Sequence, residues 1–191
     1  NDMNAEKAAF AQKTDLRSLD EVIENADMFL GLSGADILTS SMIKKMGSKP
    51  IIFALANPSP EVMPDIARKA ASDAIIATGR SDFPNQVNNV LCFPFIFRGA
   101  LDVEATEIND EMQLACIDAI AEIARKTTSA EAAAAYQGEA LTFGPEYLIP
   151  KPFDPRLSVV VSSAVAQAAM RSGVAKKLSL IHISEPTRRT S

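Results

Sequence analysis

This chain of 191 residues carries a formal net charge of −5, with 47% hydrophobic and 23% charged residues. That composition suits a folded domain with a sizeable core, and the acidic balance excludes a typical nucleic-acid-binding surface. No apolar run approaches the length of a membrane span, and the first residues lack the basic flank and apolar stretch of a signal peptide. We therefore expect one medium-sized cytoplasmic domain that binds neither nucleic acid nor membrane.

The chain starts at Asn1 rather than at a methionine, so we expect it to begin within a longer protein. Short apolar runs predict strands at residues 28–32, 50–55 and 74–77, helical spacing predicts a helix at 37–46, and residues 60–71 are expected to form the next crossover. Asp36 or Thr39 is expected to cap the first of these helices. The alternation predicts an α/β fold, and the nearly all-apolar strands predict a parallel sheet buried on both faces.

Asparagines follow two of these strands. Asn57 comes directly after the second strand and before Pro58, which restricts it to extended backbone, and Asn88 and Asn89 open the apolar segment 90–101. In an open parallel sheet, ligands bind beyond the carboxyl ends of the strands. A carboxamide both donates and accepts hydrogen bonds. The loops GLSGAD, ANPSP and TGRSDFPNQVNN are therefore the predicted binding surface for a small, oxygen-rich ligand.

Each of these features also has a purely structural interpretation. Asn57 could cap its own loop, and Asn88 or Asn89 could cap the helix predicted at 90–101. The spacing of Gly31 and Gly34 is that of many plain connections from a strand to a helix, and the G-x-G-x-x-G phosphate turn is absent. From the residues alone, the structural interpretations stay open.

Further along the chain, most features indicate packing. Arg80 and Asp82 are expected to form a salt bridge, and Asn85 and Gln86 to satisfy loop backbone groups. The core of the predicted helix 90–101 is assigned to Phe93, Phe95, Ile96 and Phe97, with Pro94 in the first turn. Asn109 and Asp154 precede two long amphipathic helices, joined by a proline-rich connection, FGPEYLIPKPF, expected on the surface.

The cysteines and the histidine exclude several chemistries. Cys92 and Cys116 lack the spacing of a metal or redox motif and are expected to be reduced thiols within the core. The only histidine, His182, lies in residues 178–191, a stretch that resembles translated sequencing adapter and is treated as a non-native tail. A histidine general base, a Ser-His-Asp triad and a histidine-ligated zinc site are therefore excluded.

Four long blocks of sequence resemble the NAD(P)-binding domain of malic enzymes, in particular the bacterial branch. They are FLGLSGADILT, PIIFALANPSPEVMP, ATGRSDFPNQVNNVLCFPFIFRGALD and FGPEYLIPKPFDPRL, and the resemblance covers most of residues 10–175. It implies a Rossmann-like parallel sheet with flanking helices, truncated at its N-terminal side and followed by C-terminal helices. Residues 1–177 would then be the C-terminal part of that domain.

The resemblance also implies a reaction, the oxidative decarboxylation of malate to pyruvate and CO₂ with reduction of NAD or NADP. It places the substrate at Asn57 and Asn89, and the cofactor at Gly31, Ser33, Gly34, Asn57 and Asn88. The family's catalytic Tyr and Lys and its ligands for Mg or Mn belong upstream, and neither Tyr136 nor Tyr147 matches those motifs. We therefore assign no catalytic residue and no metal ligand to this chain, and expect the chain alone to be inactive and the whole enzyme to be a homo-oligomer.

Three alternatives remain at this point. The chain could belong to another NAD(P)-dependent oxidoreductase, which a different set of upstream acids and bases would reveal. It could be a non-catalytic nucleotide-binding module, which would bind a dinucleotide without upstream carboxylates. It could also be an inert truncated product.

Overall fold

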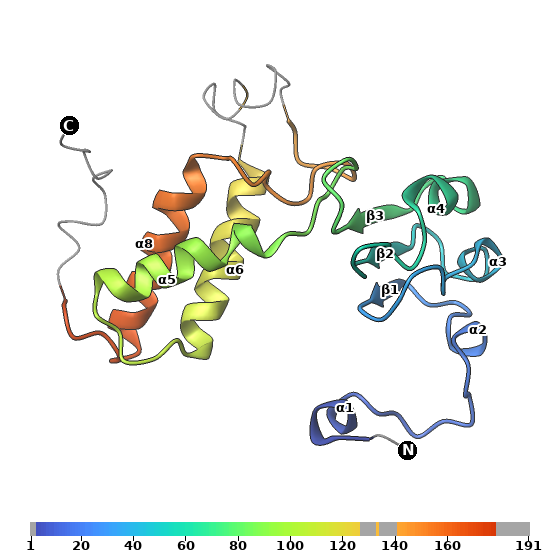
Figure 1. The fold of residues 1–191 in the computed structure, drawn as a ribbon, viewed down its shortest axis with the longest axis horizontal. Coiled ribbons are helices and arrows are strands. Elements are labelled where there is room, and N and C mark those ends of the chain that lie inside the picture. Colours follow the sequence, from blue (N-terminus) through green and yellow to red (C-terminus); the bar gives the residue numbers. More distant parts are fainter. Residues whose placement is uncertain (1–2, 127–132, 134–140, 179–191) are drawn as a thin grey trace.

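The computed structural model describes residues 3–126, 133 and 141–178, which form two groups of elements (Figure 1). The sheet half, residues 3–87, contains α1 (Ala5–Ala9), α2 (Leu19–Val22), β1 (Met28–Gly31), α3 (Ser40–Ile43), β2 (Ile51–Ala54), α4 (Pro64–Ala70) and β3 (Ile75–Thr78). The helical half, residues 88–126 and 141–178, contains the 3₁₀ turn η1 (Asn89–Leu91), α5 (Phe93–Asp102), α6 (Asp110–Arg125) and α8 (Arg156–Arg171). No helix in these ranges is long and apolar enough to cross a membrane.

The three strands form a parallel sheet in the order β1-β2-β3, which confirms the predicted α/β class and all three strands. The register pairs Gly31 with Ala54 and Ala54 with Thr78, so the last residues of the strands are aligned across the sheet. Each strand is followed by a loop at this carboxyl edge. The loops that carry the predicted ligand-binding residues therefore start side by side.

Only one face of the sheet is well buried, so the prediction of burial on both faces is wrong for this chain. Ile52 and Ile76 are buried in a cluster that includes residues of α3 and α4, such as Ile43 and Ala67. Side chains alternate between the faces of a strand. On the opposite face Met28 is 46% exposed, because no described element covers it.

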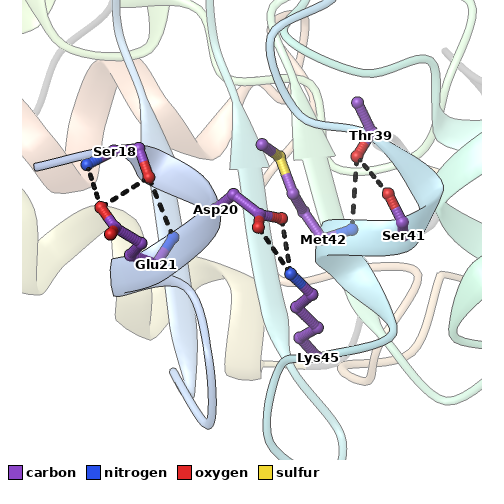
Figure 2. Close-up of polar contacts among 7 residues, drawn as sticks. All are labelled: Ser18, Asp20, Glu21, Thr39, Ser41, Met42 and Lys45. Atoms are coloured by element: carbon purple, nitrogen blue, oxygen red, sulfur yellow. Dashed lines mark hydrogen bonds and ion pairs between the residues drawn. The ribbon is translucent and has the colours of Figure 1, made fainter. Parts of the chain in front are cut away.

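Two polar interactions hold α2 and α3 in place (Figure 2). At the start of α2, Ser18 and Glu21 form a capping box in which each side chain accepts a hydrogen bond from the other residue's backbone. The Lys45 ammonium, just beyond α3, donates to both carboxylate oxygens of Asp20 at 2.7 and 2.6 Å. The pair connects the ends of the two short helices across an exposed surface.

Helix α3 is shorter than the predicted helix at 37–46. Thr39 is its N-cap, as one of the two expected alternatives, and accepts from the Met42 amide at 3.3 Å. Asp36 has a left-handed backbone with φ of 58°, and the Leu38 amide donates to the Glu61 carbonyl oxygen at 3.0 Å. Residues 36–38 therefore form a turn held by the next loop, although their apolar spacing is helical.

The predicted helix at 90–101 begins as the 3₁₀ turn η1 and continues as α5, with Pro94 in its first turn as expected. Ile96 is buried, but Phe93 and Phe97 are each 50% exposed, so their assignment to the core is wrong. Their rings stack on each other with centroids 5.9 Å apart. Residues four apart lie on the same side of a helix, and these two lie on the outer side of α5.

The helical half has its own core, separate from that of the sheet half. Helices α6 and α8, each of 16 residues, pack along each other, and α5 packs on α8 (Figure 1). A Cβ atom at Gly99 would lie 2.8 Å from the Val165 Cβ, so glycine permits the close approach of α5 and α8. Asn109 caps α6 as predicted and accepts from the Met112 amide at 3.1 Å.

Both cysteines are free thiols within this second core, as predicted. The Sγ atoms of Cys92 and Cys116 are 3.4 Å apart. Burial, and then the neighbouring Cys92 thiol, raise the pKa of Cys116 to about 12. Cys116 therefore stays protonated at neutral pH and acts as a small apolar side chain.

The proline-rich connection before α8 lies on the surface, as predicted, with Phe143 and Phe153 exposed, but it is anchored by a few buried residues. Tyr147 is 5% exposed. Asn85 is the reason: its Nδ2 donates to the carbonyl oxygens of Ile76 at 3.0 Å and Pro145 at 2.7 Å, and its Oδ1 accepts from the Leu148 amide at 2.7 Å. Asn85 thus satisfies backbone groups, as predicted, and joins β3 to the connection.

Candidate functional site

The candidate site lies at the carboxyl edge of the sheet, where three loops follow the aligned strand ends. The loop after β3 leaves the sheet and returns to it, because the Val87 amide donates to the Thr78 carbonyl oxygen at 2.8 Å. Asn88 and Asn89 come directly after this return. All three predicted loops therefore begin or end at one edge of the sheet.

Asn57 is exposed and is joined to Pro58 by a cis peptide bond. No hydrogen bond from its carboxamide to any described residue is found, so the structure does not show the loop cap that the structural interpretation required. A Cβ atom at Gly79 would lie 3.2 Å from the Asn57 Oδ1. The carboxamide thus lies against the backbone that follows β3, with its donors and acceptor available to a ligand.

The two adjacent asparagines have different environments. The Asn88 Oδ1 accepts from the Val90 amide at 3.0 Å and caps η1, so the structural interpretation holds for this oxygen. Asn89 is exposed, and its side chain makes no hydrogen bond within the described ranges. Of this pair, Asn89 is therefore the one whose whole carboxamide is available to a ligand.

The loop after β1 contains the predicted cofactor residues Gly31, Ser33 and Gly34. Gly31 is buried, and a Cβ atom there would lie 2.6 Å from the Glu61 Oε1, so a larger residue would collide. The Ser33 side chain is exposed, while its amide donates to the Glu61 Oε1 at 3.0 Å. Gly34 has open space around it, with nothing within 4 Å of an added Cβ.

Sequence reasoning missed two residues of this site, Glu61 and Gly79. Glu61 is fully buried, and its Oε2 accepts from the Ala56 amide at 3.1 Å. A carboxylate three residues after the Asn57-Pro58 pair has the sequence pattern of an ordinary surface residue, so nothing in the sequence indicated its burial. Gly79 follows β3 directly, and the only signal was its position at a strand end.

The salt bridge predicted between Arg80 and Asp82 is present. The Arg80 Nε and Nη2 donate to the two oxygens of Asp82 at 2.9 and 2.7 Å, and the guanidinium lies 5.6 Å from the centre of the Phe83 ring. The hydrogen bond lowers the pKa of Asp82 and raises that of Arg80. Both charges are therefore neutralised locally, which supports the structural role over a substrate clamp.

Two cavities of the described structure do not coincide with the predicted residues. One, of about 560 Å³, lies between the loop 81–86 and the proline-rich connection, and Tyr147 lines it. The other, of about 570 Å³, lies between α6 and α8. Asn57, Asn89 and the glycines line neither of them. Tyr136 and His182 lie outside the described residues.

The predicted residues at this edge offer neutral hydrogen-bonding groups. Asn57 and Asn89 offer neutral carboxamides, whereas the amides of Ser33 and Ala56 are already taken by the negative Glu61 carboxylate. A nicotinamide and its ribose fit such donors and acceptors better than phosphates do. Within the described ranges, no group of three His, Cys, Asp or Glu side chains could hold a metal ion. The two asparagines can hold the carboxamide or hydroxyl groups of a ligand.

A family model described as the malic enzyme NAD-binding domain matches residues 2–136, which is most of the chain. This chain belongs to the malic enzyme family. It is 62% identical over 172 residues to an NADP-dependent malic enzyme of Escherichia coli, covering 90% of this chain and 23% of that protein. It is 57% identical over 175 residues to an NAD-dependent malic enzyme of Rhizobium meliloti, covering 92% of this chain and 23% of that protein.

Solved malic enzyme structures match the fold. The crystal structure of malic enzyme from Pyrococcus horikoshii has a TM-score of 0.69 at 41% identity, covering 83% of this chain and 33% of that one. The crystal structure of the Entamoeba histolytica malic enzyme has a TM-score of 0.75 at 37% identity, covering 91% of this chain and 34% of that one. The expected Rossmann-like malic enzyme fold with C-terminal helices is thereby confirmed. The chain spans about a quarter of the two bacterial relatives, one of which uses NAD and the other NADP.

Proposed function

We propose that residues 1–177 form the part of an NAD(P)-dependent malic enzyme that holds malate and the nicotinamide end of the cofactor. The whole enzyme would convert malate to pyruvate and CO₂, with Mg or Mn bound by residues outside this chain. Residues 178–191 would have no part in it. The observation that carries the proposal is the exposed Asn57 carboxamide, which lies over Gly79 at the edge of the sheet with no hydrogen bond to a described residue.

In this proposal the chain contributes binding and orientation. NAD(P), when bound, supplies the hydride acceptor. Asn57 would donate to and accept from malate and the nicotinamide, and Asn89 would donate to a malate carboxylate. Gly31, Ser33, Gly34 and Asn88 would line the cofactor side. Fixing two reactants at a productive distance lowers the barrier, because the entropic cost is met on binding.

A chimera tests the proposal. Residues 3–175 of this chain replace the aligned segment of the E. coli enzyme, and malate-dependent formation of NADPH is measured. In this chimera Asn57→Ala and Asn89→Ala should each lower kcat/KM by about 5- to 150-fold, equivalent to about 1–3 kcal/mol of transition-state stabilisation. Because neither side chain bonds to a described residue, thermal stability should be unchanged.

Asn109→Ala is the matched control, since this asparagine only caps α6 and bonds to Ser172. It should lower stability and leave the kinetic constants of the folded chimera unchanged. If the two site variants keep full kcat/KM, the proposed roles are wrong. A folded chimera that binds NADP without oxidising malate would favour the non-catalytic module. The 191-residue chain alone should not oxidise malate.

The proposal also covers assembly and location. The whole protein is proposed to be a cytoplasmic homo-oligomer. Two free cysteines, rather than a disulfide, are what a reducing compartment favours. The stacked, half-exposed Phe93 and Phe97 on α5 supply apolar surface of the kind that subunit contacts use.

A further inference from the structure

Glu61 is the one fully buried acidic side chain among the described residues, and its two oxygens serve different loops. Oε1 accepts from the Ser33 amide at 3.0 Å, in the loop after β1. Oε2 accepts from the Ala56 amide at 3.1 Å, in the turn that contains Asn57. A single carboxylate therefore connects the cofactor-side loop with the substrate-side turn.

The backbone around Glu61 is held by the same loop. The Asp36 amide donates to the Pro60 carbonyl oxygen at 3.2 Å, and the Leu38 amide donates to the Glu61 carbonyl oxygen at 3.0 Å. Gly31 leaves the space that the carboxylate fills. Backbone and side chain of this residue are thus both fixed, so the carboxylate acts as a spacer of defined length between Ser33 and Ala56.

A carboxylate suits this position better than a carboxamide does. Both partners are N–H donors, and a carboxylate can accept from both, whereas a carboxamide has one acceptor and would turn an N–H toward the other donor. No Lys or Arg pairs with Glu61 in the described part of the chain. A buried charge without a cation is costly, and the two amide hydrogen bonds offset part of that cost. Glu61 therefore fixes the distance between the two amides as well as satisfying them.

We propose that Glu61 is a positioning residue for the reaction: by holding the Ser33 and Ala56 amides together, it sets the distance between the cofactor-side loop and Asn57. This inference rests on the proposed function of those loops. Glu61 itself touches neither substrate nor cofactor. Its loss should therefore change the kinetic constants for both, although it contacts neither.

The test uses Glu61→Gln in the chimera and, in parallel, in the full 191-residue chain. In the chimera we expect the KM values for both malate and NADP to rise about tenfold, because small displacements of positioning groups have effects of that size or more. In the chain, hydrogen exchange at the Ser33 or Ala56 amide should be at least tenfold faster. Glu61→Met, which keeps the volume but accepts from neither amide, should speed exchange at both.

Asp154→Asn is the control, since Asp154 is another buried carboxylate but bonds only at the start of α8, to Arg156. It should lower thermal stability with unchanged KM values. If Glu61→Gln keeps both KM values while only thermal stability falls, the role is structural and the proposal is overturned. Unchanged exchange at both amides overturns it as well, and this readout does not depend on activity. Failure of the unmodified chimera to oxidise malate would instead refute the proposed function.

Discussion

The two halves of the chain are stabilised in different ways. The helical half contains two 16-residue helices whose core residues, such as Leu157 and Val165, are fully buried. The sheet half consists mostly of four-residue elements, and single polar groups such as Glu61 and Lys45 connect them. The predicted ligand-binding residues lie in, or next to, the second kind of structure. Where apolar packing is thin, the geometry of a site depends on individual hydrogen bonds, so conservative substitutions there should have specific effects.

The largest expected effect lies in the helical half. Leu157→Ala removes a fully buried side chain from the interior of this core and should lower the free energy of unfolding by about 2–5 kcal/mol. Chemical denaturation of the full chain measures it. Leu101→Ala, at a side chain that is 73% exposed, is the control and should change little. Equal losses at the two positions would show that this half has no packed core.

In the sheet half, Gly31→Ala should destabilise by about 1–3 kcal/mol, because the new methyl group would overlap the buried Glu61 carboxylate. Gly34→Ala, three residues along the same loop, has open space and should leave stability unchanged. Combining Gly31→Ala with Glu61→Ala should recover part of the loss, since the carboxylate is then gone. A simple sum of the two single losses would contradict the close contact.

The contact between the sheet and the proline-rich connection is tested at Asn85. Asn85→Ala removes three hydrogen bonds and leaves the Leu148 amide without its partner, so we expect a loss of about 1–3 kcal/mol. Exposure of Tyr147 should follow and can be measured by tyrosine fluorescence in a Tyr136→Phe background, since the chain has two tyrosines. Gln86→Ala, which removes one long bond of 3.4 Å to the Gly79 carbonyl oxygen, is the neighbouring control. Similar losses of stability in Asn85→Ala and Gln86→Ala would show that Asn85 does not hold the connection against the sheet.

The smallest expected effect concerns the exposed Arg80–Asp82 pair. Hydrogen bonding to Arg80 lowers the pKa of Asp82 in the folded chain. This pair therefore stabilises the fold above the unfolded pKa of about 4, and its contribution is lost as the pH falls through the lower folded value. An NMR titration of the Asp82 carboxyl should show the low pKa, and Arg80→Ala should return it to the ordinary range. An ordinary pKa in the unmodified chain would show that the pair does not form in solution.

Local patterns predicted the elements well and their environments less well. The three strands, the Asn109 cap and the position of Pro94 follow from residue type and spacing, which act over a few residues. Met28 and Phe97 were expected to be buried because they are apolar, but burial depends on which elements cover a face. Sequence patterns carry no such information when the covering element is distant in the chain or outside it.

The same limit applies to the candidate site. Asn57 and Asn89 could be singled out because they follow strand and loop ends, and the structure leaves both side chains exposed. Glu61 could not be, because its importance comes from two amides, Ser33 and Ala56, that a carboxylate meets only after the loops have folded. Asn88, whose oxygen caps η1, shows the converse, since the same residue type at the next position serves the backbone.

The open face of β1 has a practical consequence. Along this strand Met28 and Leu30 are 46% and 55% exposed, and β1 pairs with β2 on one side only within the described structure. An apolar strand with a free edge is a template for strands of other molecules, so the chain should self-associate as its concentration rises. Leu30→Lys places a charge on that face without touching the buried cluster. This single substitution is therefore the first choice for keeping concentrated samples of the chain monodisperse.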